Sequence, residues 1–88
     1  MKLITRDSDY AIRALCRMSA CGKRIVTVDA LRRETRIPRA FLRKILQRLN
    51  ARGVIRSYKG RGGGFSMSAG PGAIRILDVI RIFQRDVA

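Results

Sequence analysis

The fold of this chain is decided by residues 37–68, which read IPRAFLRKILQRLNARGVIRSYKGRGGGFSMS. In the first half of this stretch, apolar side chains recur at positions i, i+3, i+4 and i+7: Leu42, Ile45, Leu46 and Leu49. This spacing gathers them on one side of an α-helix, which must bury that side against the rest of the protein. We therefore predict a helix with one face in the core, over about residues 38–52.

The opposite face of the same helix is polar and cationic. Each residue turns the helix by about 100°, so the side chains that point away from the apolar stripe are Ala40, Arg43, Lys44 and Gln47. Pro38 suits the first turn, where its missing N–H would have no partner in any case. Gly53 is typical of the residue that ends a helix.

A β-hairpin is predicted directly after this helix, over about residues 54–68. Two short runs, VIRSY and FSMS, contain β-branched or aromatic residues and are separated by the glycine-rich residues 59–64. The hairpin tip carries Lys59 and Arg61 on a backbone with almost no other side chains. Such a tip suits close approach to another molecule; the alternative is a turn whose cations are incidental.

The charges of the chain are unevenly distributed. All of its acids lie outside residues 35–77: Asp7, Asp9, Asp29, Glu34, Asp78 and Asp86. That interval contains many cations: Arg36, Arg39, Arg43, Lys44, Arg48, Arg52, Arg56, Lys59, Arg61 and Arg75. A helix face that is merely solvated usually mixes both signs, so we expect an acid-free surface that meets a polyanion.

Length and composition predict one small domain, residues 1–88, with a single core. Hydrophobic residues make up 47% of the chain, enough for it to fold, and the formal net charge is +14. This charge favours nucleic acid as a partner, ahead of an anionic membrane surface. No apolar run has the length of a membrane span and no signal peptide is recognisable, so we expect a cytoplasmic protein without a membrane partner.

The remaining elements complete a familiar arrangement. A first helix is expected after a cap at Thr5 or Ser8, and a second after a cap at Thr27, with Asp29 in its first turn. Residues 24–26 suit a short strand that pairs with the hairpin, and a last helix is expected at about residues 76–85. The predicted fold class is mainly α with a small β-hairpin, a winged helix-turn-helix.

Catalytic and cofactor chemistry find little support in the sequence. The chain has no histidine, and its two cysteines, Cys16 and Cys21, lie about 140° apart if both are helical, so they do not converge on one metal. The glycines near residue 60 lack the Lys-Ser/Thr of a P-loop, and a strand rather than a helix follows them. We predict no enzyme activity and no cofactor held by this chain.

The sequence resembles the Rrf2 family of bacterial winged-helix transcription regulators, which includes iron-sulfur and nitric-oxide responsive repressors. Three blocks carry the resemblance: DYAIRAL at 9–15, IPRAFLRKIL at 37–46, and GVIRSYKG at 53–60 with GGF at 63–65. Residues 76–80, ILDVI, are similar to the family's next helix. The resemblance extends over nearly all of this chain.

The resemblance implies a repressor that binds palindromic promoter DNA as a homodimer. It places recognition-helix contacts at Arg39, Ala40, Arg43 and Lys44, and wing contacts at Lys59, Gly60 and Arg61. In the family, a later segment often carries three cysteines for an iron-sulfur cluster and a long dimerisation helix; neither is found in this sequence. A cluster is therefore expected only if a longer parent protein supplies the cysteines, and the chain is either a fragment of one or a form that dimerises otherwise.

The sequence thus predicts a set of residues for binding double-stranded DNA: Arg36, Arg39, Ala40, Arg43, Lys44, Gln47, Arg56, Tyr58, Lys59, Gly60 and Arg61. Arg39, Arg43 and Lys44 are candidates for contacts to base edges. Arg36, Arg56, Lys59 and Arg61 are candidates for phosphate contacts, as is the hydroxyl of Tyr58. Two alternatives are a winged-helix module that docks an acidic protein, and membrane attachment through an apolar face at Ile82 and Phe83.

Overall fold

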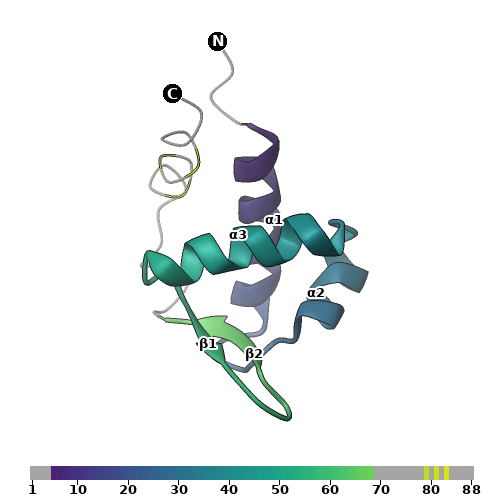
Figure 1. Cartoon of the computed structure of the whole chain (residues 1–88), viewed down its shortest axis with the longest axis vertical. Coiled ribbons are helices and arrows are strands. Elements are labelled where there is room, and N and C mark those ends of the chain that lie inside the picture. The colour runs from purple at the N-terminus through teal and green to yellow at the C-terminus, as the bar shows by residue number, and fades with distance from the viewer. Residues whose placement is uncertain (1–4, 69–78, 80, 82, 84–88) are drawn as a thin grey trace.

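Three helices are followed by a two-stranded hairpin in the computed structural model, which describes residues 5–68 together with 79, 81 and 83. The elements are α1 (Arg6–Ala20), α2 (Val28–Thr35), α3 (Arg39–Ala51), β1 (Ile55–Tyr58) and β2 (Gly64–Met67). In Figure 1, α3 lies across α1, with α2 beside the start of α3 and the hairpin below its end. The predicted class, mainly α with a small hairpin, is confirmed.

The core lies where the three helices meet the base of the hairpin. The apolar stripe of α3 is buried as predicted, at Leu42, Ile45, Leu46 and Leu49. It packs in one cluster with Ala11, Ala14, Leu15 and Met18 of α1, Leu31 of α2, and Ile55 and Met67 of the hairpin. Because this single cluster fixes one face of α3, the opposite face of α3 must point outward.

Side-chain caps define the starts of α1 and α2. Thr5 and Ser8, offered as alternatives for α1, act together: the Ser8 backbone N–H donates to Thr5 Oγ1 at 3.1 Å, and the Thr5 N–H donates to Ser8 Oγ at 2.8 Å. Thr27 caps α2 as predicted, and its hydroxyl oxygen accepts from the Ala30 N–H at 3.1 Å. These bonds satisfy N–H groups that would otherwise lack partners at the helix starts.

Helix α3 is slightly shorter than predicted. Pro38 precedes the helix as its N-cap, with φ −54° and ψ 137°, instead of lying in its first turn. The helix ends at Ala51, and Gly53 follows with φ +77°, the left-handed conformation that glycine adopts most readily. At the end of the helix the Arg52 N–H donates to Arg48 O at 3.2 Å.

The connection from α2 to α3 is tight, with only residues 36–38 between the two helices. Arg36, directly after α2, has φ +60° and ψ 21°, and it is the one non-glycine residue with positive φ in the part of the chain that the structure describes. The hydroxyl of Thr35 donates to Leu31 O at 2.6 Å and accepts from the Ile37 N–H at 3.3 Å. Together these features turn the chain abruptly and join α2 and α3 as a helix-turn-helix.

The hairpin is an antiparallel pair in which Ile55 opposes Met67 and Tyr58 opposes Gly64. The strand predicted at residues 24–26 is reduced to a single bridge between Val26 and Phe65. The Val26 N–H donates to Phe65 O at 2.7 Å, and the Phe65 N–H donates to Val26 O at 2.9 Å. The prediction was too long because residues 21–24 form a turn.

Most of the last helix predicted for about residues 76–85 lies outside the described residues. Val79 and Phe83 are described, and both are helical and buried. The Arg48 guanidinium lies 4.4 Å from the centre of the Phe83 ring. Phe83 therefore does not offer the exposed apolar face on which membrane attachment depended. No described helix is both long enough and apolar enough to cross a membrane.

Candidate nucleic-acid interface

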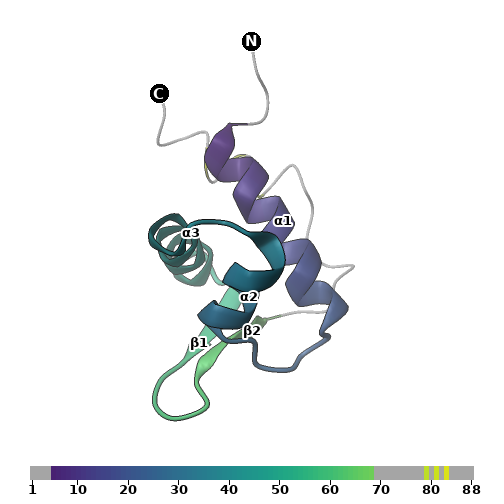
Figure 2. The same cartoon turned by 90° about the vertical axis from the view of Figure 1, so that its right-hand side faces the viewer.

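A groove separates α3 from the hairpin, with the start of α2 at one end. Figure 2 shows α3 and the hairpin on the left-hand side of the molecule, with α1 on the right-hand side. The groove is lined by α3, by the hairpin and by the first residues of the α2 region: Arg39, Arg43, Gln47 and Asn50; Ser57, Tyr58, Lys59, Gly60, Gly62, Gly63, Gly64 and Phe65; and Thr27, Val28 and Asp29. The recognition helix and wing expected from the sequence therefore share one concave surface.

The outer face of α3 is arranged as the helical periodicity predicted. Ala40, Arg43, Lys44 and Gln47 are all exposed, whereas Leu42, Ile45 and Leu46 between them are buried. Ala40 adds only a methyl group near the start of the helix, so the backbone there is open to close approach. Arg43 and Gln47 line the groove, and Lys44 lies outside its lining.

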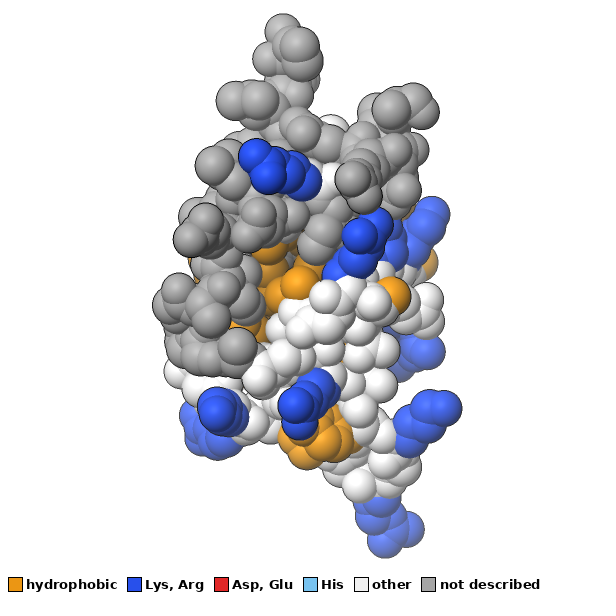
Figure 3. All heavy atoms as spheres, turned by 90° about the vertical axis from the view of Figure 1, so that its left-hand side faces the viewer, with side chains coloured by type: hydrophobic (Ala, Val, Ile, Leu, Met, Phe, Trp, Pro, Cys, Tyr) orange, Lys and Arg blue, Asp and Glu red, His pale blue; other side chains and the backbone are white. Residues whose placement is uncertain are grey.

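The hairpin contributes cations at its tip. Lys59, Gly60 and Arg61 are exposed, as are Arg56 and Tyr58 on β1. The turn is tight: a Cβ atom on Gly63 would lie 2.3 Å from the carbonyl oxygen of Tyr58. Seen from the left-hand side of Figure 1, the described residues show Lys and Arg side chains around the hairpin and no Asp or Glu (Figure 3).

Most of the predicted DNA-binding cations are exposed and have no carboxylate partner among the described residues: Arg36, Arg43, Lys44, Arg56, Lys59 and Arg61. Exposed cations without acids nearby leave a net positive potential over α3 and the hairpin. The described acids Asp7, Asp9 and Glu34 instead pair with arginines that lie mainly on α1: Arg6, Arg13, Arg17 and, more distantly, Arg48 of α3.

One acid does reach this surface, which corrects the expectation that it is acid-free. Asp29 lines the groove, and its Oδ1 accepts from Arg39 Nη1 at 2.7 Å. The sequence placed Asp29 only in the first turn of α2, where a carboxylate suits the helix N-terminus. The contact with Arg39 depends on how α2 and α3 cross, which the spacing of residues along the chain does not encode.

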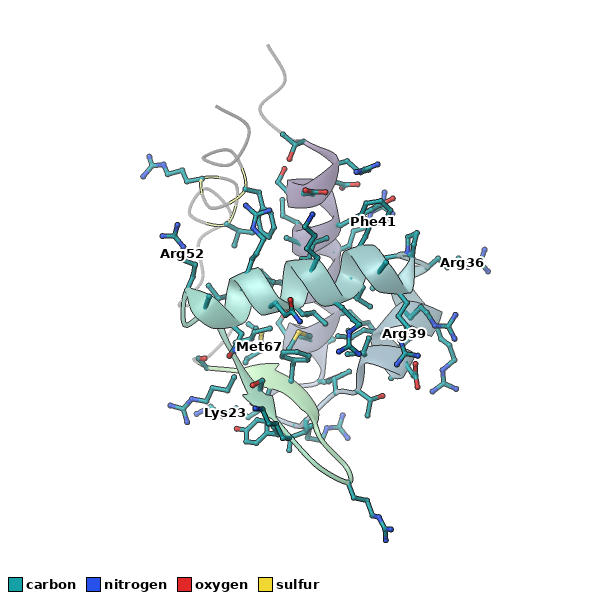
Figure 4. All side chains as sticks on the ribbon, in the orientation of Figure 1. Lys23, Arg36, Arg39, Phe41, Arg52 and Met67 are labelled. Atoms are coloured by element: carbon teal, nitrogen blue, oxygen red, sulfur yellow. The ribbon has the colours of Figure 1, made fainter. Side chains whose placement is uncertain are left out.

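The structure does not bring all predicted site residues into one place. Arg39, Arg43, Gln47, Tyr58, Lys59 and Gly60 line the groove, whereas Arg36, Ala40, Lys44, Arg56 and Arg61 lie outside its lining. Figure 4 shows Arg36 extending from the turn before α3, away from the hairpin. The sequence reasoning missed Asn50, which follows Arg43 and Gln47 at i+7 and i+3 and therefore shares their helix face.

Tyr58 is less available than predicted. Its hydroxyl oxygen accepts a hydrogen bond from the buried Ser66 across the hairpin, at 3.2 Å. The side chain is 41% exposed, so the ring still forms part of the groove wall. The phenol is thus held by the hairpin, and it retains its own O–H as a donor.

A second hollow lies between α1 and the end of α2, where Glu34 binds Arg17 through two hydrogen bonds, with Arg17 Nη2 2.9 Å from Glu34 Oε1. The hydrogen bond from Arg17 lowers the pKa of Glu34, and the same contact raises the pKa of Arg17. Cys16 lines this hollow and is a free, exposed thiol. None of the residues predicted to bind DNA lines it.

The described residues contain no group of three or more His, Cys, Asp or Glu side chains that could hold a metal ion. Cys16 is exposed and Cys21 is half-buried. These side chains do not fit an iron centre.

Comparison with known proteins assigns the chain to a family. Residues 4–88 match the family model Rrf2, described as an iron-dependent transcriptional regulator. A protein of Aquifex aeolicus named as an HTH-type transcriptional regulator is 40% identical over 74 residues, which are 84% of this chain and 51% of that protein. A protein of Mycobacterium tuberculosis with a similar name is 33% identical over 86 residues, 97% of this chain and 53% of that one. The chain thus spans about half the length of these relatives.

Two solved structures show the same fold. The global cysteine regulator CymR of B. subtilis superposes with a TM-score of 0.85 at 20% identity, covering 93% of this chain and 64% of that one. IscR of T. potens superposes with a TM-score of 0.83 at 20% identity, covering 93% and 60%. These likenesses confirm the winged helix-turn-helix, and the family match over residues 4–88 confirms the resemblance first seen in the sequence. The chain belongs to the Rrf2 family of transcriptional regulators.

Proposed function

We propose that this chain binds double-stranded DNA sequence-specifically and represses transcription at a palindromic promoter site to which two copies bind in the cytoplasm. The observation that carries the proposal is the groove shared by Arg43 of α3 and Lys59 of the hairpin, two exposed cations that no described acid pairs with. A repressor of this kind acts by occluding polymerase.

In this proposal α3 enters the major groove of the duplex. That groove is about 12 Å wide and admits one α-helix, with side chains on its outer face reaching base edges. Arg39, Arg43 and Lys44 are the donors for base edges, and guanine, with two acceptors side by side, is the favoured target of arginine. Gln47 shares this face and suits adenine, which offers one donor and one acceptor.

The hairpin then lies along the neighbouring backbone or minor groove. Lys59 and Arg61 are exposed at its tip, where Gly60 leaves the backbone open. Arg36, Arg56 and the Tyr58 O–H are placed to contact phosphates, which fix the register of the protein but carry no base code. Repeating these contacts in two copies related by a two-fold axis would require an inverted repeat in the DNA.

Selection of bound sites from a random duplex pool tests the proposal directly. We expect enrichment of one sequence that contains an inverted repeat, and affinity for it that falls steeply as salt rises, because bound cations release counterions from DNA. Recovery of sequences with no shared motif would refute sequence-specific binding. Binding to an acidic protein with no affinity for duplex DNA would instead identify a docking module.

A further inference from the structure

The contact between Asp29 and Arg39 joins the first turn of α2 to the first residue of α3. Asp29 Oδ1 and Arg39 Nη1 are 2.7 Å apart, both side chains are more than half exposed, and both residues line the groove. Figure 4 shows Arg39 on the side of α3 that faces α2. The pair is therefore part of the surface that the proposed function presents to DNA.

A carboxylate in this groove weakens the binding of a polyanion by charge repulsion, so we expect Asp29 to have a second effect that favours binding. Asp29 repels phosphates, yet it lines the same groove as Arg43 and Lys59, two exposed cations that have no carboxylate partner among the described residues. Its contribution to folding is expected to be small, because exposed ion pairs stabilise proteins weakly and Thr27 already caps α2. The position of Asp29 is better explained by what it does to Arg39.

The geometry leaves the part of Arg39 that reads a base free. The hydrogen bond to Asp29 engages Nη1. A guanidinium carries five N–H donors in a rigid planar fork, so Nη2 and Nε remain available as two parallel donors. Two parallel donors match the O6 and N7 acceptors of guanine. A free arginine side chain would have to give up many conformers to present the same edge.

We propose that Asp29 is a positioning residue that holds the Arg39 guanidinium in the orientation needed for base recognition. This inference rests on the proposed function and adds a determinant of specificity to it. The pair is weak in water, but the approach of DNA removes water from the groove and strengthens the attraction between the two charges. Asp29 then acts on base preference through Arg39, without touching the DNA.

The test uses four proteins: the wild type, Asp29→Ala, Arg39→Ala and the double variant. Each is titrated with the duplex selected from the random pool, with a scrambled duplex, and with duplexes changed at one position at a time. We expect Asp29→Ala to reduce the ratio of the affinity for the selected duplex to the affinity for the scrambled duplex about tenfold, within the range that one paired base contact provides. The preference should be lost at the same base position as in Arg39→Ala, and the double variant should lose no more than Arg39→Ala alone.

Three results from Asp29→Ala and the double variant would overturn the inference. An equal gain of affinity for both duplexes would mean that Asp29 only repels phosphates, and a sharper preference would mean that it holds Arg39 away from the bases. A further loss in the double variant would mean that Asp29 acts independently of Arg39. If the wild type shows no base preference, the proposed function fails, and this inference fails with it.

Two further variants control for folding and for charge. Asp29→Asn keeps an oxygen that accepts from Arg39 and should retain more of the preference than Asp29→Ala; equal losses would contradict positioning through this oxygen. Glu34→Ala removes the acid of the Arg17 pair, which lies away from the groove, and should leave base preference unchanged. If Asp29→Ala unfolds by circular dichroism, Asp29→Asn alone decides the question, with no change in preference counting against the inference.

Discussion

Replacing Gly64 with alanine should detach the hairpin from the segment that leads into α2. Gly64 opens β2, and a Cβ atom added there would lie 2.3 Å from the carbonyl oxygen of Val26 and 2.9 Å from its carbonyl carbon. Both are backbone atoms, so no change of rotamer relieves the overlap. The alanine therefore has to displace Val26, whose bridge to Phe65 connects the hairpin to the helices.

The expected loss of stability follows from the two hydrogen bonds of the bridge between Val26 and Phe65, which measure 2.7 and 2.9 Å. Each contributes about 0.5 to 1.5 kcal/mol, so losing both lowers the free energy of unfolding by about 1 to 3 kcal/mol. For a domain of this size, each kcal/mol shifts the melting temperature by about 4 to 8 °C. Ile55 and Met67 remain in the core, so the hairpin base should stay attached.

Thermal melting and amide hydrogen exchange measure this effect together. Gly64→Ala should melt at least about 4 °C below the wild type, and the amides of Val26 and Phe65 should exchange faster. Gly62→Ala is the matched control, because nothing lies within 4 Å of its added Cβ and only the φ of +76° opposes the substitution. The control should lose stability through backbone strain alone, about 1 to 2 kcal/mol, and should keep both amides protected.

The binding assay extends the same prediction to function. If the bridge holds the hairpin in place along the groove, Gly64→Ala should weaken the phosphate contacts of Lys59 and Arg61. The slope of log affinity against log salt concentration should then become shallower by up to about two units. A melting temperature within about 2 °C of the wild type, with both amides still protected, would refute the reasoning. It would mean that the backbone around Val26 accommodates a Cβ atom without cost.

Four other changes test separate features. Arg43→Ala should cost about 1 to 3 kcal/mol on the selected duplex and almost nothing on scrambled DNA, as measured by fluorescence anisotropy; equal losses would make it a phosphate contact. Lys59→Ala should weaken binding to every sequence and lower the salt slope by about one unit, and an unchanged slope would exclude it from the interface. Arg36→Gly should be about 1 kcal/mol more stable to urea than Arg36→Ala, because only glycine adopts φ +60° without strain; equal stabilities would contradict that strain. Bonding to Arg17 lowers the pKa of Glu34, so the stability that this pair contributes is present above the ordinary carboxyl pKa and is lost as the pH falls through the lowered pKa of Glu34. Glu34→Gln should therefore flatten the dependence of unfolding free energy on pH below about pH 4, as measured by urea titrations. An unchanged dependence would show that the pair contributes nothing.

The features that could be predicted from sequence are those encoded by local spacing. The apolar side chains of α3 recur with the helical period, and the core that receives them leaves Arg43 and Gln47 outside. Thr27 caps α2 and Gly53 follows α3 because each meets a need of the adjacent backbone. Such preferences act over a few residues, and the printed sequence contains them in full.

The features that could not be predicted depend on packing between distant segments. Residues 24–26 have the composition of a strand, but the turn before them leaves one bridge at Val26 instead of a paired strand. Which of the exposed cations lie in the groove is likewise set by how α3 crosses the hairpin, so Lys59 lines it while Lys44, on the helix itself, does not. Helical periodicity assigns a residue to a face, and it does not say what lies opposite that face.

Asp29 shows why the charge of a sequence interval differs from the charge of a surface. The acid-free interval begins after Glu34, and the helix-turn-helix then folds the start of α2 back beside the start of α3, so an acid from outside the interval enters the groove. Glu34, only five residues later, lies at the other end of α2 and pairs with Arg17 of α1 instead. Two acids of one short helix thus face different partners, and the one in the groove is paired with an arginine whose free edge can still reach a base. Base preference in this protein should therefore depend on a residue that the cationic stretch does not contain.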